Sequence, residues 1–211
     1  SRASWLTQIG YGGPQWAITA AYRYGQCGDR PNRRGTEFAN QTQSCTTTSK
    51  KGAVRDADAF SNNFALTAAW QPKEAGWIPS ISAGWGVNDL NNSGYVYGKN
   101  ASKSDQYFGR NKANNIDVSQ SWMVGLQWND LFVKGNAFGM AVGQPTFATS
   151  LRKGDPDDGN YAWEWWYKFQ VTDNISVTPA LFYLSRPDGQ LTPSGKTSNV
   201  FGGLIQTQFK F

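Results

Sequence analysis

The 211-residue chain contains no histidine, only two cysteines, and no uninterrupted apolar run of about 18 residues. The missing apolar run excludes a protein that crosses the bilayer with helices. Without histidine the commonest general base is absent, and no acid–base or nucleophile constellation is recognisable. Two cysteines alone are too few ligands for a zinc site. We therefore expect no enzyme, no metal and no cofactor.

The charge balance is mildly basic, with a net charge of +5. The 20 lysines and arginines are scattered, and pairs such as Arg33-Arg34 and Lys50-Lys51 lie in polar stretches. Solvated loops are the ordinary meaning of such pairs. A nucleic-acid-binding surface would gather its basic residues on one element or face, so nucleic acid is not expected as a partner.

The two cysteines, Cys27 and Cys45, lie in one polar stretch with little strand character. A pair inside a single loop predicts a disulfide formed in an oxidising compartment.

The final stretch, residues 199–211, alternates bulky and polar side chains and ends on phenylalanine. One face of this extended strand would carry Phe201, Ile205, Phe209 and Phe211, and the other Leu204, Gln206, Gln208 and Lys210. Soluble chains commonly end in polar, frayed residues, whereas a last strand that ends on an aromatic is common in bacterial outer-membrane β-barrels.

The same alternation predicts nine strands, at residues 3–11, 15–24, 59–70, 77–87, 116–128, 131–142, 161–171, 175–184 and 198–211. Most of them match the roughly 9–11 residues that a tilted strand needs to cross a bilayer. Short turns and long polar loops alternate strictly between them. This asymmetry is typical of outer-membrane barrels, which have short periplasmic turns and longer external loops.

Two features of this pattern are irregular. In the strand at 131–142, Lys134 and Asn136 would share a face with the apolar residue Phe138, so its orientation stays open. Pro79 and Pro179 each remove a backbone donor inside a predicted strand.

Aromatic residues gather at the two ends of the predicted strands, as interfacial solvation of amphipathic rings would produce. The periplasmic set is Trp16, Trp70, Trp77, Trp128, Phe169, Phe209 and Phe211, and the external set is Tyr22, Tyr24, Phe60, Trp85, Tyr161, Trp163, Tyr183 and Phe201. A soluble sandwich with an aromatic core is the less favoured alternative.

The opposite strand faces carry small and polar residues, which suit a water-filled interior and therefore a barrel of roughly 16 strands or more. We predict an all-β fold, an antiparallel transmembrane β-barrel of which residues 1–211 form the C-terminal nine or so strands. Strands before residue 1 would then be missing from this chain. The charged residues expected to line the pore are Arg23, Asp117, Glu164, Lys168 and Lys210.

These assignments have alternatives. Glu164 and Lys168 could instead pair with each other as wall structure. Asp155, Asp157 and Asp158 could bind calcium, although a solvated acidic loop is the more frequent meaning of such a cluster.

Two stretches also carry a resemblance to a known family. One is Gly143-Gln144-Pro145, and the other is the strand pair that begins Ala162-Trp163-Glu164-Trp165-Trp166 and runs to Phe182. They resemble the OprB-type carbohydrate-selective porins, in particular the cyanobacterial major outer-membrane porins. The resemblance covers most of the chain and is strongest from about residue 130 onward.

The resemblance implies a 16-stranded, trimeric passive channel in the outer-membrane lipid, with one loop folded into the pore. Full-length members carry an N-terminal surface-layer-homology domain, which would link the barrel to cell-wall polymer. Sugar-binding members line the constriction with arginine, glutamate and aromatics, whereas the cyanobacterial branch is associated more with inorganic ions, including iron.

We therefore expect a porin for small hydrophilic solutes and inorganic ions. A sugar-selective channel is the first alternative, and a soluble carbohydrate-binding β protein is the second.

Overall fold

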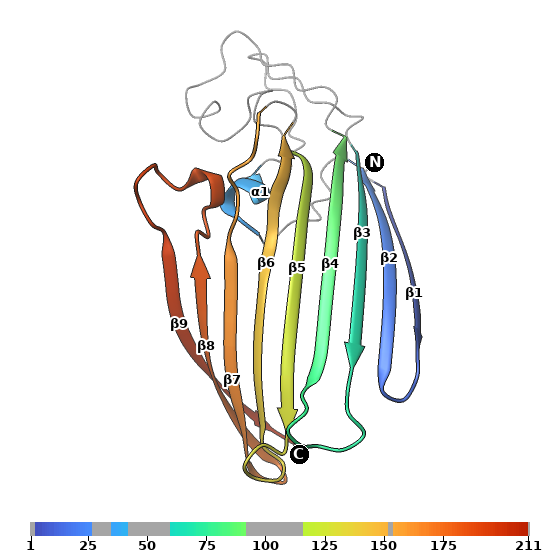
Figure 1. Ribbon diagram of the computed structural model, residues 1–211, viewed down its shortest axis with the longest axis vertical. Coiled ribbons are helices and arrows are strands. Elements are labelled where there is room, and N and C mark those ends of the chain that lie inside the picture. Colours follow the sequence, from blue (N-terminus) through green and yellow to red (C-terminus); the bar gives the residue numbers. More distant parts are fainter. Residues whose placement is uncertain (1–2, 27–34, 42–59, 92–115, 152–153, 211) are drawn as a thin grey trace.

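A computed structural model describes residues 3–26, 35–41, 60–91, 116–151 and 154–210, and these form one nine-stranded antiparallel sheet. The strands are β1 (Ser4–Gly12), β2 (Trp16–Gln26), β3 (Phe60–Trp70), β4 (Ser80–Asn91), β5 (Ile116–Asn129), β6 (Ala137–Leu151), β7 (Tyr161–Thr172), β8 (Ile175–Ser185) and β9 (Asn199–Phe209). Each strand pairs with its neighbours in sequence, so the order in the sheet is the order in the chain (Figure 1). The predicted all-β fold with nine strands is confirmed.

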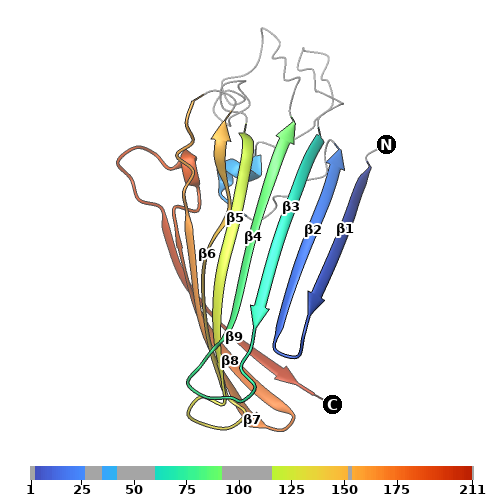
Figure 2. The same ribbon diagram turned by 45° about the vertical axis from the view of Figure 1, so that its right-hand side comes forward.

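The sheet is strongly curved, as the view in Figure 2 shows, and it is not closed. Among the described strands, β1 and β9 each pair on one side only. The described helices are short: α1 (Glu37–Gln41) and the 3₁₀ helix η2 (Gly189–Leu191). Neither is long and apolar enough to cross a membrane.

The connections alternate between the two ends of the sheet as predicted, but their lengths do not alternate strictly, because 71–79 and 152–160 each span nine residues. The short turns, at 13–15, 71–79, 130–136 and 173–174, share one end of the sheet, which we call the turn end (Figure 1). The longer connections, at 27–59, 92–115, 152–160 and 186–198, belong to the opposite end, the loop end.

The predicted strand at 131–142 is wrong in position, because β6 runs from Ala137 to Leu151. Residues 130–136 form a turn in which Asp130, Phe132 and Gly135 have positive φ values of 55°, 65° and 91°. Such backbone cannot continue a strand. The Asp130 carboxylate further fixes the turn by accepting a hydrogen bond from the Gly135 N–H at 2.7 Å.

This correction removes the irregular orientation of the segment, since Lys134 and Asn136 lie in the turn. It also places Pro145 inside a strand that the sequence had suggested would end before it. β6 pairs with β7 only as far as Gly143, and its register with β5 shifts between Gln144 and Phe147. Pro145 therefore lies at an irregularity of the ladder with β5 and beyond the last pair with β7, where a missing N–H costs little.

The register aligns one apolar face across all nine strands. Pairs on this outer face include Trp16↔Trp70, Leu66↔Trp85, Val124↔Val142, Met140↔Trp165 and Pro179↔Ile205. Its side chains are unusually exposed for their size: Ile9 is 72% exposed and Ile205 73%. Such a surface is unfavourable in water and suits lipid.

Aromatics follow the predicted arrangement at both ends of this outer face. At the turn end, Trp16 pairs with Trp70, and Trp128 lies 5.7 Å from Phe138 between ring centroids. At the loop end, the Tyr22 and Phe64 rings are 4.9 Å apart. Phe211, predicted in the turn-end set, lies outside the described residues.

Candidate channel wall

The inner face of the sheet is made of small side chains over most of its width. From β2 to β6 it carries Ala17, Thr19, Ala21, Ser61, Asn63, Ala65, Thr67, Ala69, Ser80, Ser82, Gly84, Gly86, Gly125, Gln127, Gly139, Ala141 and Gly143. Short polar and glycine residues leave free volume in front of the sheet and cannot build a close-packed apolar core. The surface can therefore face water.

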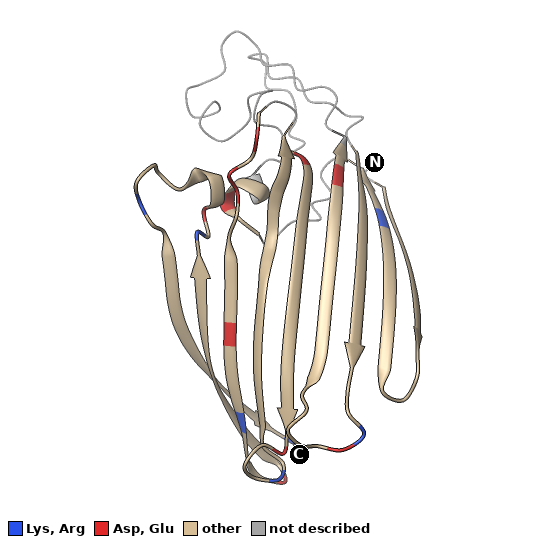
Figure 3. Ribbon diagram, viewed as in Figure 1, with Lys and Arg blue, Asp and Glu red and all other residues tan. Residues whose placement is uncertain are grey.

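Charges are rare within the strands and gather mainly toward the two ends of the sheet (Figure 3). Those in the nine described strands are Arg23, Asp89, Asp117, Glu164 and Lys168. All except Asp89 were predicted pore-lining residues.

Arg23 lies on the inner face of β2, opposite Leu6 and Asn63. The Asn63 side-chain amide donates to the Arg23 backbone carbonyl at 2.9 Å, which ties the two strands together near the loop end.

Glu164 and Lys168 lie on the inner face of β7, opposite Ala141 and Ala137 of β6. Within the described part of the chain no ion pair joins them. Four residues of extended strand separate their backbones by roughly 13 Å. Arg23 is far from both, because β2 and β7 are five strand steps apart, or roughly 24 Å along the sheet.

The two remaining charged candidates lie at the margins. Asp117 falls where the register between β5 and β6 shifts, next to the fully buried Ile116, so strand alternation alone does not fix its direction. Lys210 follows the end of β9, and its backbone N–H donates to the Asn174 carbonyl at 2.9 Å at the turn end. Cys27 and Cys45 lie outside the described residues.

Two aromatic residues of the inner face, Trp166 on β7 and Phe182 on β8, were not among the predicted pore-lining residues. Each lies flat over a glycine of the adjacent strand, since a methyl group added to Gly139 would overlap the Trp166 ring and one added to Gly202 the Phe182 ring. Trp166 shares its face with Glu164, and Phe182 is directly opposite Glu164. Their even numbering, shared with Glu164 and Lys168, was the available signal.

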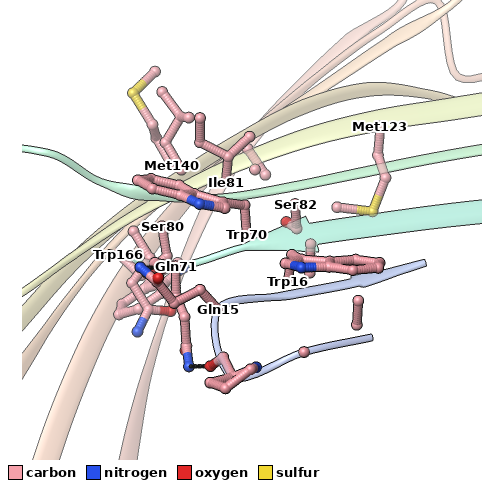
Figure 4. Close-up of a pocket in the computed structure, with 18 residues that line it drawn as sticks. Gln15, Trp16, Trp70, Gln71, Ser80, Ile81, Ser82, Met123, Met140 and Trp166 are labelled. Carbon is pink, nitrogen blue, oxygen red and sulfur yellow. Dashed lines mark hydrogen bonds between the residues drawn. The ribbon is translucent and has the colours of Figure 1, made fainter. Parts of the chain in front are cut away.

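Trp166 borders a cavity of about 500 Å³ near the turn end. Its lining includes the inner-face residues Ala17, Ala69, Ser80, Ser82, Met123, Gly125, Gln127 and Ala141 and the outer-face residues Trp16, Trp70, Ile81, Leu126 and Met140. Figure 4 shows that Trp16, Ser82, Met123 and Trp166 reach it from separate strands. The cavity thus combines three indole rings, of Trp16, Trp70 and Trp166, with small hydroxyl and amide groups.

At the loop end, residues 35–41 cross the inner face, and we call this segment the strap. Phe38 and Ala39 are 1% and 0% exposed, and they pack against Leu90, Ile116 and Ala148. Leu90 shares its strand face with Gly86, and Ala148 pairs with Ser119. The strap therefore packs on the inner face.

The strap also pairs with β6 where that strand has lost β7 as a neighbour. Gly35 forms a parallel bridge with Thr146, and the Thr36 N–H donates to the Thr146 carbonyl at 2.9 Å. A methyl group on Gly35 would overlap the Thr146 backbone, so only glycine permits this approach.

Asp158 joins three segments at this point and is 1% exposed. One carboxylate oxygen accepts from the Thr36 hydroxyl and from the Ala148 N–H, each at 2.7 Å. The other accepts from the Gln190 N–H at 2.9 Å. The expectation of a solvated acidic loop is therefore wrong for Asp158, because its neighbours bury it.

Burial raises the pKa of the Asp158 carboxyl above its ordinary value. The hydrogen bonds from Ala148, Thr36 and Gln190 and the charge of Arg186 act in the opposite direction. The adjacent Asp157 is exposed instead and forms an ion pair with Arg186 at 3.0 Å. Among the described residues, no group of acidic residues is arranged to hold a metal ion.

Comparison with known proteins agrees with this geometry. The family model of the carbohydrate-selective porins, OprB family, matches residues 12–211. The chain belongs to the OprB family. An uncharacterized protein, alr4550, of Nostoc sp. (strain PCC 7120) is 26% identical over 200 residues, which cover 94% of this chain and 30% of that protein. No solved structure matches.

The OprB family is a family of channels rather than enzymes. A sheet with one apolar face and one polar face is what a channel wall in a lipid bilayer requires. The chain spans about 30% of the length of the Nostoc relative.

Proposed function

We propose that this chain forms part of the wall of an outer-membrane porin through which small hydrophilic solutes and inorganic ions diffuse passively. The observation that carries the proposal is the pairing of an exposed apolar outer face with an inner face of small polar residues on one curved sheet. Lipid on one side and water on the other satisfy both faces.

The open edges support a larger barrel. β1 and β9 each have one unpaired side, and unpaired backbone groups are not stable in hydrocarbon. A water-filled barrel of about 16 strands would complete both edges, with residues 1–211 as its C-terminal part. A homotrimer, and attachment to cell-wall polymer through an N-terminal domain, remain proposals drawn from the family resemblance.

Sugar selectivity is the second candidate, and Trp166 is the observation that favours it. The Trp166 indole shares its strand face with Glu164 and lines one cavity with Ser80 and Ser82, so the site offers both stacking and hydrogen bonds, the combination that small polar ligands with an apolar face require. A soluble carbohydrate-binding protein is disfavoured, because it would leave the whole outer face in water.

The test is reconstitution of the full-length protein into planar bilayers, together with fractionation of cells. We expect the protein to partition with outer membranes, to need detergent for solubility, and to form channels whose current follows salt concentration. Millimolar maltose or glucose that blocks wild-type channels but not Trp166→Ala channels would favour the sugar-selective candidate. Full solubility without detergent would contradict both.

A further inference from the structure

The strap is held by two different kinds of contact, one apolar and one polar. Phe38 and Ala39 supply the apolar contact with the inner face. The polar contact depends on Asp158, which receives hydrogen bonds from the strap, from β6 and from η2. Thr36 and Asp158 are 122 residues apart in sequence, so no local turn would bring them together.

Thr36 connects Asp158 to the fold of the strap itself. Its hydroxyl donates to Asp158 and also accepts from the Ala39 N–H at 3.0 Å, which starts the short helix α1. The Glu37 N–H donates to the Pro187 carbonyl at 3.0 Å, beside the turn that precedes η2. The strap is thus bonded on one side to β6 and on the other to the 186–198 connection.

The backbone around Asp158 is shaped to admit the carboxylate. Gly189 has a positive φ of 58°, and a methyl group there would overlap both Asp158 and Thr36. Next to this turn, Arg186 donates two hydrogen bonds to the Asp157 carboxylate, at 3.1 Å and 3.0 Å. These bonds tie the segment that carries Asp158 to the 186–198 connection.

We propose that the Asp158 carboxyl group is the latch that holds the strap across the inner face, and that the latched strap sets the free cross-section at the loop end of the pore. The second half of this inference rests on the proposed channel function, because it takes the inner face as the lumen. The first half concerns only packing and can be measured without any channel. Asp158 acts here as a positioning residue for the strap.

Glycine variants provide a matched test on the full-length protein in detergent. Gly189→Ala should displace the latch. Gly195→Ala introduces the same strain at a positive φ of 75° in the same connection, but its added methyl group has nothing within 4 Å. We expect backbone amides of the strap, at Thr36 and Ala39, to exchange hydrogen at least about tenfold faster in Gly189→Ala and at the wild-type rate in Gly195→Ala.

Two further variants keep the test decisive if Gly189→Ala folds poorly. Thr36→Val keeps the shape of the side chain and removes only its hydroxyl, and Asp158→Ala removes the acceptor. Both should accelerate exchange of the amide at position 36, whose acceptor, the Thr146 carbonyl, neither substitution removes, and should leave the amides of β8 and β9 protected. Ala39 is not a readout in Thr36→Val, because its amide donates to the hydroxyl that this substitution removes. Unchanged strap exchange in both variants would overturn the latch.

Single-channel conductance then tests the position of the strap in the pore. Variants that accelerate strap exchange should have a larger conductance than the wild type, and Gly195→Ala should not. Faster exchange without a conductance change would overturn the constriction role of the strap. A wild-type protein that forms no channel would instead contradict the proposed function, while the exchange data would still decide the latch.

Discussion

At the residue scale, the face of each strand residue is the property on which the function depends. Ile205 and Gln206 are neighbours on β9 but pair with Pro179 and Thr178, which lie on opposite faces of the sheet. The exposed fraction alone does not separate the two faces, because Leu204 on the inner face is 51% exposed. The pairing register does separate them, since residues paired directly across neighbouring strands lie on the same face of the sheet.

This assignment leads to a matched pair of substitutions. Ile205→Arg should impair assembly into the membrane by about 2–4 kcal/mol, because it places a charge in mid-strand against lipid. Gln206→Arg, one residue away, should be tolerated because it faces water. Folding into lipid vesicles, followed by heat-modifiable migration on gels, measures both. Equal effects of the two substitutions would contradict this assignment of faces, and a larger effect of Gln206→Arg would show that the faces are the wrong way round.

A second prediction at this scale concerns the cysteines. Cys27 and Cys45 are expected to be bonded to each other, and closing a loop of about 18 residues would restrict the unfolded chain by roughly 3 kcal/mol. Thiol labelling of the native protein, with and without reductant, measures this. Labelling of both cysteines before reduction would contradict the disulfide.

At the scale of elements, the strands could be predicted from sequence and the strap could not. A strand of the wall alternates between lipid and water, so its period of two is present in every short window. The strap is defined by contacts at long range, such as Thr36 with Asp158. No local sequence pattern predicts that Gly35 pairs with Thr146. The edge of β6 is open to the strap only beyond Gly143, where the pairing of β6 with β7 ends.

The error at β6 has the same physical origin. The alternation of Phe138, Met140 and Val142 is genuine, but the turn before it was invisible without backbone angles. Asp130 and Phe132 adopt positive φ although neither is glycine. The Asn136 side chain then secures this turn from outside the strand by accepting from the Gln170 N–H at 2.9 Å.

The strap should respond to pH through Asp158, whose pKa burial raises above the ordinary value of 3.8. The charged groups around it are Arg186 and Asp157 beside it, Glu37 on α1, and Asp188 before η2, while the facing part of β6 carries none. A raised pKa means that the docked strap favours the protonated form. Docking therefore gains free energy as pH falls through the raised pKa and has gained it fully below the ordinary one.

We expect exchange protection of the strap, corrected for intrinsic rates, to be higher at about pH 4 than at about pH 7. Asp158→Asn should remove this dependence, because the amide does not titrate. Mass-spectrometric hydrogen exchange on the full-length protein measures it. Protection that falls on acidification in the wild type would mean that the charged carboxylate, and not the neutral one, is the favoured form of the latch.

At the scale of the whole molecule, the wall is defined by how little it contains. From β2 to β6, Arg23 is the charged residue whose inward direction the register fixes, and most of the other inner-face residues there are small. The broad aromatic groups, Trp166 and Phe182, are confined to β7 and β8. A solute that passes this wall therefore meets one smooth side and one side with aromatic and charged groups.

The sign of the charge on this wall predicts selectivity. Arg23, Lys168 and the adjacent Lys210 are basic, and Glu164 is the acidic residue that clearly faces inward, so the described wall has an excess of positive charge. Such a wall attracts anions, with a range of about 8–10 Å at physiological ionic strength and a longer range in dilute salt. We expect a mild anion preference at low salt that fades as salt is raised. Reversal potentials across a planar bilayer under a potassium chloride gradient measure it, and Arg23→Gln and Glu164→Gln should shift the potential in opposite directions. A wild-type preference for cations, unaffected by either substitution, would show that charges outside these residues control permeation.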